Sequence, residues 1–240
     1  MSGLIFDDHD LGELFVYGDP EISILSSSVK RADSNSRNGS IVIGSTWADS
    51  TVSFTVAAIG TAEERRNAFS TLGMWFDVDE PKKLCLPDTP GRYYLAVPDG
   101  VIELNRHIGA ETAKVTFALT DPIAYGREMT LTVPSGGSIS FNVGGTYRAR
   151  PRITASAVRD SSSQVWGLKL DNADFVHVVT GSASARSVDI DCDGRTCIVN
   201  SSTSMITLDS DWLELAPGTH TLVMDKGTGA ATVKYRERWL

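Results

Sequence analysis

Cysteine is scarce in this chain of 240 residues, which contains only three. Three cysteines do not make the disulfide framework of a small secreted domain, so the sequence predicts a protein folded in a reducing cytoplasm. Long apolar runs are missing too, because no segment approaches the roughly 20 residues of a membrane helix. The N-terminal MSGLIFDDHD also lacks the positive start and apolar stretch of a secretory signal. The sequence therefore predicts neither membrane insertion nor secretion.

Positive charge is in deficit, with 22 Lys and Arg against 30 Asp and Glu, a net charge of −8 and a pI of about 5.0. A protein whose main function is to bind nucleic acid needs a clustered Lys and Arg surface, so the net charge disfavours a nucleic-acid-binding protein. It does not exclude a local basic patch, which could be formed by Lys30, Arg31, Arg37 and Arg65. The composition is otherwise that of a globular protein, and the length fits one large β domain or two modest ones.

Histidine is sparse as well, and none of the four lies in a recognisable metal or triad motif. These are His9, His107, His177 and His220. No Gly-rich phosphate loop leads from a strand into a helix. Three pairs of neighbouring aspartates fit acidic turns, namely Asp7 with Asp8, Asp171 with Asp174, and Asp209 with Asp211. The sequence predicts no enzyme, with no catalytic, cofactor-binding or metal residues and no cofactor.

What the sequence does have is hydrophobic alternation with a period of two. TVSFTVAAIG places Val52, Phe54 and Val56 on one face, and AKVTFALTDP does the same with Val115, Phe117 and Leu119. MTLTVPSGGSISFNVGG indicates two strands joined by PSGGS. Such alternation is typical of half-buried strands in antiparallel sheets.

One segment, TAEERRNAFSTLGMWF at 61–76, has helical spacing instead. Thr61 and Glu64 have the spacing of a capping box. Phe69, Leu72 and Phe76, with Trp75 beside them, form one apolar face of a helix of about four turns. We predict one amphipathic helix near 62–76, packed on a sheet by this aromatic stripe.

Residues 26–40, SSSVKRADSNSRNGS, are polar and poor in apolar side chains. This composition predicts a long mobile loop inside the first half of the chain. Its cations, together with Arg65, could form a local basic surface. We favour a solvated loop over a binding arm.

A domain boundary is predicted near TDPIAYGRE, at 120–128. After it, turn signals recur about every eight to twelve residues, as expected for a β-sandwich of about ten strands. We predict a mainly β fold. The first domain, at 1–126, is expected to be a β-barrel or sandwich-like domain with the one helix, and the second, at 127–240, a β-sandwich that folds alone. The predicted core positions of the second domain are Val143, Ile153, Ile190 and Leu215.

The stretch DIDCDGRTC at 189–197 is a candidate calcium-binding loop, because Asp189, Asp191 and Asp193 alternate before Gly194 as at the start of an EF-hand loop. The match then fails, since the twelfth position is Ser201 instead of glutamate. The flanking residues alternate as strands, and Asp193-Gly194 is a hairpin-turn dipeptide. We therefore favour the tip of a β-hairpin over a metal site.

The pairing of Cys192 and Cys197 depends on this turn. A loop of four residues, 193–196, would make the two cysteines cross-strand partners, whereas a turn of Asp193-Gly194 alone would leave the sulfurs offset. A cytoplasmic origin favours free thiols over a disulfide.

Several short motifs occur together in a fixed order. FNVGGTYRARPRITASA contains Asn142, Gly144, Ala149, Pro151 and Ile153. DWLELAPGTHTLVM, ATVKYRERWL and, in the first half, VTFALTDPIAYG complete the set, with the SVDIDCDGRTCIVN hairpin between them. These stretches resemble the distal tail (Dit) family of long-tailed phages with non-contractile tails, also called siphophage tail components. Departures from the family pattern are Val188, in place of a leucine, and Thr219 with His220, where an asparagine follows Pro-Gly.

This resemblance implies a structural role at the distal end of a virion tail. It implies a ring, usually a hexamer, whose first domain stacks on the tail tube protein and whose second domain is a galectin-like β-sandwich that docks receptor-binding or baseplate parts. It also implies a tail-tip hub or tail-associated lysin protein on the other side, and a lumen through which the tape-measure protein and DNA pass. The subunits would be made and assembled in the host cytoplasm.

Six copies of a chain with net charge −8 carry −48, so we expect a lumen that is acidic or neutral and lets DNA slide. We expect the cations of 30–37 and Arg65 with Arg66 to make protein–protein contacts. The alternative function is a carbohydrate-binding sandwich that contacts the host surface, which would need exposed aromatic side chains. Trp166, Trp212 and Trp239 are available, but the first two lie among apolar neighbours and are expected to pack in the core or at an edge.

Overall fold

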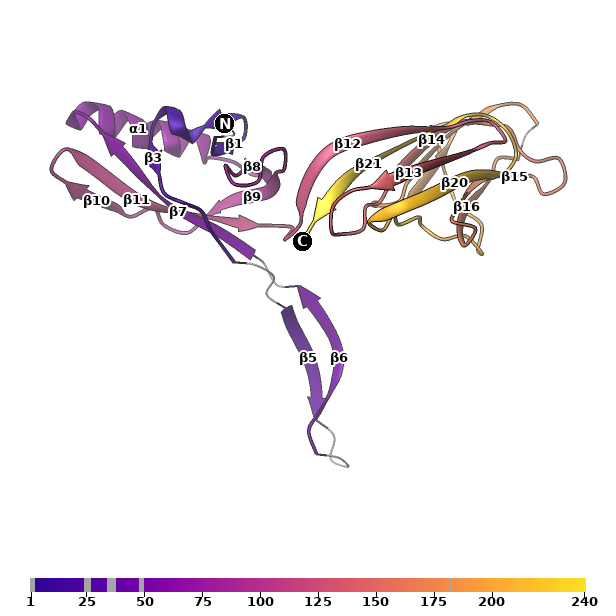
Figure 1. The fold of residues 1–240 in the computed structure, drawn as a ribbon, viewed down its shortest axis with the longest axis horizontal. Helices are drawn as coiled ribbons and strands as arrows, with labels where there is room; N and C mark the ends of the chain where they lie inside the picture. The colour runs from indigo at the N-terminus through magenta and orange to yellow at the C-terminus, as the bar shows by residue number, and fades with distance from the viewer. Residues whose placement is uncertain (1–2, 24–26, 34–37, 48–49, 182) are drawn as a thin grey trace. The chain divides into compact units, whose positions relative to one another are not determined.

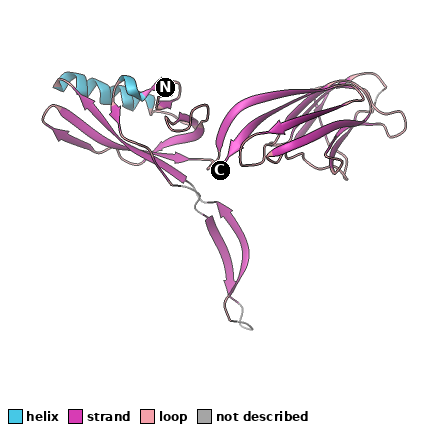
Figure 2. Cartoon of the chain, in the orientation of Figure 1, coloured by secondary structure: helices cyan, strands magenta, loops and turns pink. Residues whose placement is uncertain are grey.

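The computed structural model describes residues 3–23, 27–33, 38–47, 50–181 and 183–240. The chain forms two compact units, residues 1–124 with Leu240 and residues 125–239 (Figure 1). Strands make up most of both units, and the described residues contain a single α-helix (Figure 2). The predicted mainly β fold class, with one helix in the first half, is confirmed. The division between the units falls inside the 120–128 segment.

An antiparallel nine-stranded sheet forms the first unit, with the order β2-β1-β8-β9-β11-β7-β3 and with β10 on β11 and β4 on β7. A short 3-10 helix, Leu11–Glu13, follows β2. The strands are β1 (Ile5–Phe6), β2 (His9–Asp10), β3 (Val16–Tyr17), β4 (Glu21–Ile22), β7 (Ser50–Ile59), β8 (Lys82–Cys85), β9 (Tyr94–Asp99), β10 (Leu104–His107) and β11 (Ala110–Leu119).

The centre of this sheet is the long pair β7 and β11, whose ten residues each run antiparallel from Ala110 opposite Ile59 to Leu119 opposite Ser50. Both strands alternate as the sequence predicts. Val52, Phe54 and Val115 face the core with exposures of 0–2%, and the intervening residues are more accessible. Burial of one face of each strand therefore fixes the register of the pair.

Helix α1 (Ala62–Trp75) packs on this sheet, in contact with β7. Its capping box forms as predicted, because the Thr61 hydroxyl accepts from the backbone N–H of Glu64 and the Glu64 carboxylate accepts from that of Thr61. Leu72 is buried, and the Phe76 ring contacts the ring of Phe117 at a centroid distance of 5.2 Å. The aromatic stripe of the helix is core packing.

The expected loop at 26–40 is wrong for most of its length. Strands β5 (Ser27–Asp33) and β6 (Ser40–Trp47) pair as an antiparallel hairpin that forms a two-stranded sheet of its own. Residues 26 and 34–37 lie outside the described residues. Every apolar side chain of β6 is exposed. Strands are recognised in a sequence by the alternation of apolar and polar residues, and this alternation is absent here because neither face of the strand is buried. A bulge at Lys30 and Arg31 disturbs the alternation further.

The second unit consists of a six-stranded sheet, β12-β21-β14-β17-β18-β19, and a four-stranded sheet, β13-β20-β15-β16. The six-stranded sheet contains β12 (Ala124–Val133), β14 (Arg152–Ala157), β17 (Arg186–Asp191), β18 (Thr196–Val199), β19 (Ser202–Ser204) and β21 (Ala231–Trp239). The four-stranded sheet contains β13 (Ser138–Val143), β15 (Val165–Leu170), β16 (Asp174–Val179) and β20 (Gly218–Lys226).

The inner faces of these two sheets supply one hydrophobic core. The four predicted core positions all belong to it, with exposures of 0–2%: Val143, Ile153, Ile190 and Leu215. The two strands predicted on either side of PSGGS are β12 and β13, and they belong to opposite sheets. That turn therefore carries the chain from one layer of the sandwich to the other.

Gly145, in the NVGG motif, occupies a position that no other residue fits. Its φ is +95°, in the region that side chains with a Cβ rarely adopt. A Cβ built there would lie 2.2 Å from the carbonyl oxygen of Arg238. The motif thus brings the end of β13 against the end of β21, where the backbone N–H groups of Thr146 and Tyr147 both donate to Arg238.

Candidate functional site: assembly surfaces

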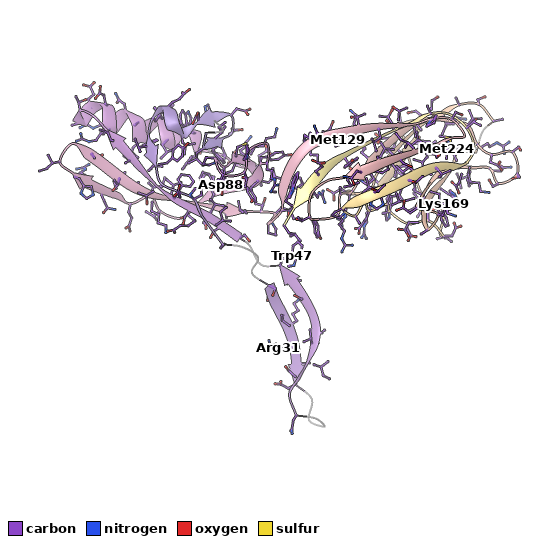
Figure 3. All side chains as sticks on the ribbon, in the orientation of Figure 1. Arg31, Trp47, Asp88, Met129, Lys169 and Met224 are labelled. Carbon is purple, nitrogen blue, oxygen red and sulfur yellow. The ribbon has the colours of Figure 1, made fainter. Side chains whose placement is uncertain are left out.

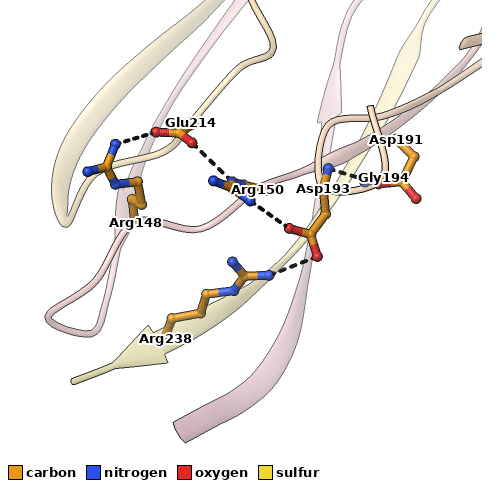
Figure 4. Close-up of polar contacts among 7 residues, drawn as sticks. All are labelled: Arg148, Arg150, Asp191, Asp193, Gly194, Glu214 and Arg238. Carbon is orange, nitrogen blue, oxygen red and sulfur yellow. Dashed lines mark hydrogen bonds and ion pairs between the residues drawn. The ribbon is translucent and has the colours of Figure 1, made fainter. Parts of the chain in front are cut away.

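The DIDCDGRTC stretch is the predicted β-hairpin, formed by β17 and β18 with Asp191 opposite Thr196. The turn is residues 192–195. The Asp191 carboxylate closes it by accepting from the backbone N–H groups of Asp193 and Gly194, at 2.9 and 3.0 Å (Figure 4). Arg195 adopts a φ of +51°, which completes the reversal. This aspartate therefore acts as a local cap for the turn.

The other two aspartates of the stretch bind arginines. Asp193 contacts Arg150 and Arg238 at 3.3 and 3.2 Å, and Glu214 contacts Arg150 and Arg148 at 3.0 and 2.5 Å (Figure 4). The Arg238 guanidinium also lies 5.2 Å from the centre of the Tyr125 ring. This chain of charges links the hairpin to the strands beside it.

Asp189 forms the best-aligned pair, because Arg152 donates to both of its carboxylate oxygens at 2.9 and 2.7 Å. The hydrogen bond from Arg152 lowers the pKa of Asp189 below its usual value. Burial raises the pKa of Glu214, but the hydrogen bonds from Arg148 and Arg150 outweigh it and the net shift is downward. Both carboxylates therefore stabilise the fold in their ionised form.

We expect the melting temperature to fall as the pH drops below about 4. A carboxylate whose pKa is lowered in the folded state stabilises the fold at pH values above its unfolded-state pKa, and this stabilisation is lost when the carboxylate is protonated at lower pH. An Arg152→Met variant should lose about 1 kcal/mol or less at neutral pH, since the pair is partly exposed, and should show a shallower loss in acid. Arg127→Met, at an exposed position of β12, is the matched control. Melting curves between pH 7 and 2.5 test this, and identical acid profiles for the two variants would contradict it.

The two cysteines of the hairpin are free thiols. Neither of the two turns considered from the sequence is the one observed. Cys192 belongs to the turn itself and Cys197 lies opposite Ile190, so the cysteines are offset. Burial raises the pKa of Cys192 to about 12 and that of Cys197 to about 11, which keeps both thiols protonated and unreactive at neutral pH.

The four histidines do not converge. His177 pairs with Asp225 at 2.9 Å, and His220 pairs with Asp171 at 2.5 Å, both in the second unit. His9 stacks on Trp75 at a centroid distance of 4.6 Å, and the remaining histidine ends β10. Within the described ranges, no three potential ligands gather closely enough to hold a metal ion. The described residues also contain no helix with the length and apolar character that a membrane crossing requires.

Two of the three tryptophans considered for sugar binding pack in the core of the sandwich. Trp166 has 0% exposure, and Trp212 is partly buried against the same cluster. The indole that is more than a third exposed is Trp47, in β6, at 42%. The sequence analysis did not single out Trp47, which lies beyond the 26–40 segment predicted as a loop, although the run IVIGSTW carries the β-branched signal of a strand.

The β5–β6 hairpin exposes three consecutive apolar side chains. Val42 and Ile43 are 62% and 69% exposed, and Ile41 is 45% exposed. Arg31 lies on the same hairpin (Figure 3). Neighbouring apolar side chains that are exposed together are typical of a surface that another molecule covers. The hairpin is therefore the leading candidate for an assembly surface.

Arg65 differs from the sequence expectation. Its side chain, 13% exposed, lies 3.7 Å from the Glu111 carboxylate, and its guanidinium donates to the carbonyl oxygen of Gly60. These contacts fix the start of α1 within the same chain, so Arg65 stabilises the fold and is not a free cation for a neighbouring subunit.

Net charge is divided unequally between the two units. Residues 1–124 carry 18 Asp and Glu against 10 Lys and Arg, a net charge of −8. Residues 125–239 carry 12 of each kind, a net charge of zero. The acidity of the protein therefore belongs entirely to the first unit.

Two family models match the chain in sequence. Residues 9–119 match the phage tail protein RIFT-related domain, and residues 144–239 match the C-terminal domain of the siphovirus-type tail component. The distal tail protein of Bacillus phage SPP1 is 25% identical over 187 residues, which cover 75% of this chain and 72% of that protein.

The fold is also similar to that of a solved structure. The crystal structure of the SPP1 protein Dit (gp 19.1) aligns with a TM-score of 0.79 at 18% identity and covers 99% of both chains. A chain of the phage p2 baseplate in its activated conformation aligns with a TM-score of 0.45 at 10% identity, covering 95% of this chain and 92% of that one. The SPP1 likeness extends over both units.

Proposed function

Since the chain belongs to the distal tail (Dit) family of siphophage tail components and is a structural protein of the phage tail, we propose that it is the ring subunit joining the tail tube to the tail-tip hub. The observation that carries this proposal is the order of the two matched domains, which fall one on each compact unit. The proposed role is mechanical, with no catalytic step, cofactor or metal.

In this proposal the first unit builds the ring, most simply a hexamer, and stacks on the tail tube protein. The second unit, a galectin-like sandwich, docks the receptor-binding or baseplate parts. The hub protein lies on the far side, and the tape-measure protein occupies the lumen. The SPP1 structure was described as a hub of the adsorption apparatus, and this supports the same placement here.

The distribution of charge supports a ring through which DNA slides without being held. The first unit, with its net charge of −8, would line or surround the channel, whereas the neutral second unit would not. A lumen rich in Lys and Arg would bind phosphates at each step and slow passage. An acidic ring repels the DNA backbone and keeps the channel free.

The alternative, a carbohydrate-binding sandwich, is not favoured. Stacking on a sugar needs an aromatic face open to solvent. Trp166 is fully buried, and Trp212 packs against the core of the same unit. The observations therefore favour a scaffold whose surfaces meet other proteins.

We expect purified protein to form rings with an open centre in negative-stain images, and light scattering to give a mass that is a whole multiple of the 25.9 kDa chain. The subunit contact should be heterologous, since a head-to-tail contact is what closes a ring. It should bury well over about 1,000 Å² per pair, as lasting assemblies do. A chain that stays monomeric at every concentration would contradict the ring.

A further inference from the structure

Buried polar atoms without a partner gather at one end of the second unit. Among the described residues, eight buried side-chain nitrogen and oxygen atoms have no hydrogen-bond partner. Five of them belong to four residues of the sandwich, and the other three belong to the first unit. The five atoms are Nε and Nη1 of Arg159, Nε1 of Trp166, Oγ1 of Thr180 and Nε of Arg186. A buried polar group without a partner is costly, so this cluster needs a physical explanation.

The two arginines lie where the inner face of the six-stranded sheet ends. Strand β14 ends at Ala157, which is fully buried and lies opposite Arg186. Cross-strand partners share a face, so Arg186 is on the side of the core. Val158 then bridges Thr228, which extends the strand by one residue and brings Arg159 to the face of Ala157. Both guanidinium groups therefore belong to the same end of the sandwich.

The facing sheet contributes the other two residues. Trp166 lies opposite Val178, and both are buried in the core. Thr180 follows two residues after Val178 on the same face and is 7% exposed. A Cβ built on Gly227 would lie 3.1 Å from Cδ1 of Trp166 and 2.3 Å from the carbonyl oxygen of Val158. The indole edge that carries Nε1 thus lies beside the segment that leads into the first arginine.

The unpaired atoms define the kind of group that is missing. All five can donate a hydrogen bond, and the four nitrogens cannot accept one, so the missing group is an acceptor. It is also negative, because a guanidinium keeps its charge and neither Arg159 nor Arg186 takes part in the ion pairs formed among the described residues. The neighbouring carboxylate of Asp160 accepts instead from the backbone N–H groups of Ser162 and Ser163, both at 2.9 Å.

The number of donors and the charge favour a phosphate group over a carboxylate. A carboxylate has two oxygens with about four acceptor sites, fewer than the five donors at this end of the sandwich. A phosphate monoester has three strong acceptor oxygens and a charge of about −1.5 to −2 at neutral pH, which balances two guanidinium groups. Arginine is also the side chain whose planar fork binds phosphate oxygens in pairs.

We infer that this end of the second unit is a phosphate-binding site, made by Arg159 and Arg186 with the Thr180 hydroxyl and the Trp166 indole. Both arginines are only partly buried, so a ligand can reach them from solvent. A bound phosphate supplies the acceptors and the negative charge that the chain itself does not provide there. The site lies at the opposite end of β17 from the 192–195 turn, and it does not depend on the proposed ring.

Titration calorimetry of the full chain with inorganic phosphate tests the site. We expect saturable binding of one phosphate per chain, at an ionic strength held constant with chloride. Arg159→Met and Arg186→Met each keep an apolar stem and remove the donors and the charge, so each should weaken binding at least about tenfold. Arg195→Met, at an exposed arginine in the turn at the other end of β17, is the matched control and should bind phosphate as the parent does.

Melting gives a second readout, which an arginine with a purely structural role would not produce. Phosphate should raise the melting temperature of the parent's second unit by at least about 3 °C, because a ligand that binds the folded state stabilises it. In chloride alone, Arg186→Met should melt at or above the temperature of the parent, since it no longer buries an unpaired charge. In saturating phosphate this order should reverse.

A second probe, methyl phosphate, distinguishes two sources of the group. Binding of both probes would mean that the site takes a phosphate carried by a larger molecule, whereas binding of inorganic phosphate alone would mean that it holds a free ion. Acetate that binds as tightly as phosphate would overturn the choice of phosphate. The site itself is overturned if neither phosphate probe binds saturably, or if Arg186→Met and Arg195→Met respond to phosphate equally.

Discussion

A Leu215→Asp variant should leave the second unit unfolded at 25 °C. Leu215 has 0% exposure in the core of the sandwich, and its backbone exchanges two hydrogen bonds of 2.8 Å with Ala149. An aspartate at this position would bury a carboxylate without a partner, which costs roughly 4 kcal/mol or more, a large part of the stability of a domain. Near-UV circular dichroism should lose the signal of the buried Trp166, and the calorimetric transition of the second unit should disappear.

The matched control is Leu208→Asp, seven residues earlier, where the side chain is 104% exposed. The same chemical change in solvent should alter the free energy of unfolding by less than about 0.5 kcal/mol. Equal melting of the two variants would mean that the core described around Leu215 is not the one that holds this unit together.

A Phe117→Ala variant should destabilise the first unit by about 3–5 kcal/mol. The ring of Phe117 is fully buried and lies 4.8 Å from that of Phe6, 5.8 Å from that of Phe54 and 5.2 Å from that of Phe76, centroid to centroid. Truncation removes the apolar contacts and leaves a cavity that these three rings cannot fill without leaving their rotamers. Denaturant titration measures the loss in the free energy of unfolding, and calorimetry shows which unit's thermal transition has moved.

The second unit should keep its own transition in this variant, because the two hydrophobic cores share no residue. Val16→Ala, 63% exposed in β3, is the control and should melt like the parent. A simultaneous loss of both transitions in Phe117→Ala would show that the units unfold as one cooperative body, against the division that their contacts indicate.

The parts of the fold that the sequence predicted well are those with one buried face. In β7 and β11 the core fixes a strict alternation, and in α1 the capping box and the spacing of Phe69 and Leu72 give local signals. The 189–197 hairpin was recognised because its turn chemistry is local as well. Each of these signals lies within a few neighbouring residues.

The features that the sequence did not predict depend on burial and on contacts between distant residues, which local sequence patterns do not show. The hairpin of β5 and β6 has no face buried in its own chain, so its strands lack the alternation by which strands are found. Arg150 and Asp193 are 43 residues apart, and only the folded sandwich brings them to 3.3 Å. The turn at 192–195 was shifted from both expected positions because the Asp191 carboxylate caps it and Arg195 takes a positive φ. Candidate assembly residues were therefore found from exposure, after the fold was known.

The second unit begins on β12 and ends on β21, and these two strands are neighbours in the same sheet. Its entry and exit thus leave the sandwich side by side, as the ends of an insert do. An exchange of the coding sequence between codons 125 and 239 would therefore replace the whole sandwich and leave the chain that precedes it unchanged. Recombination at these two junctions would vary the neutral sandwich while the acidic first unit is inherited intact, and a foreign sandwich could be grafted between the same junctions in the laboratory.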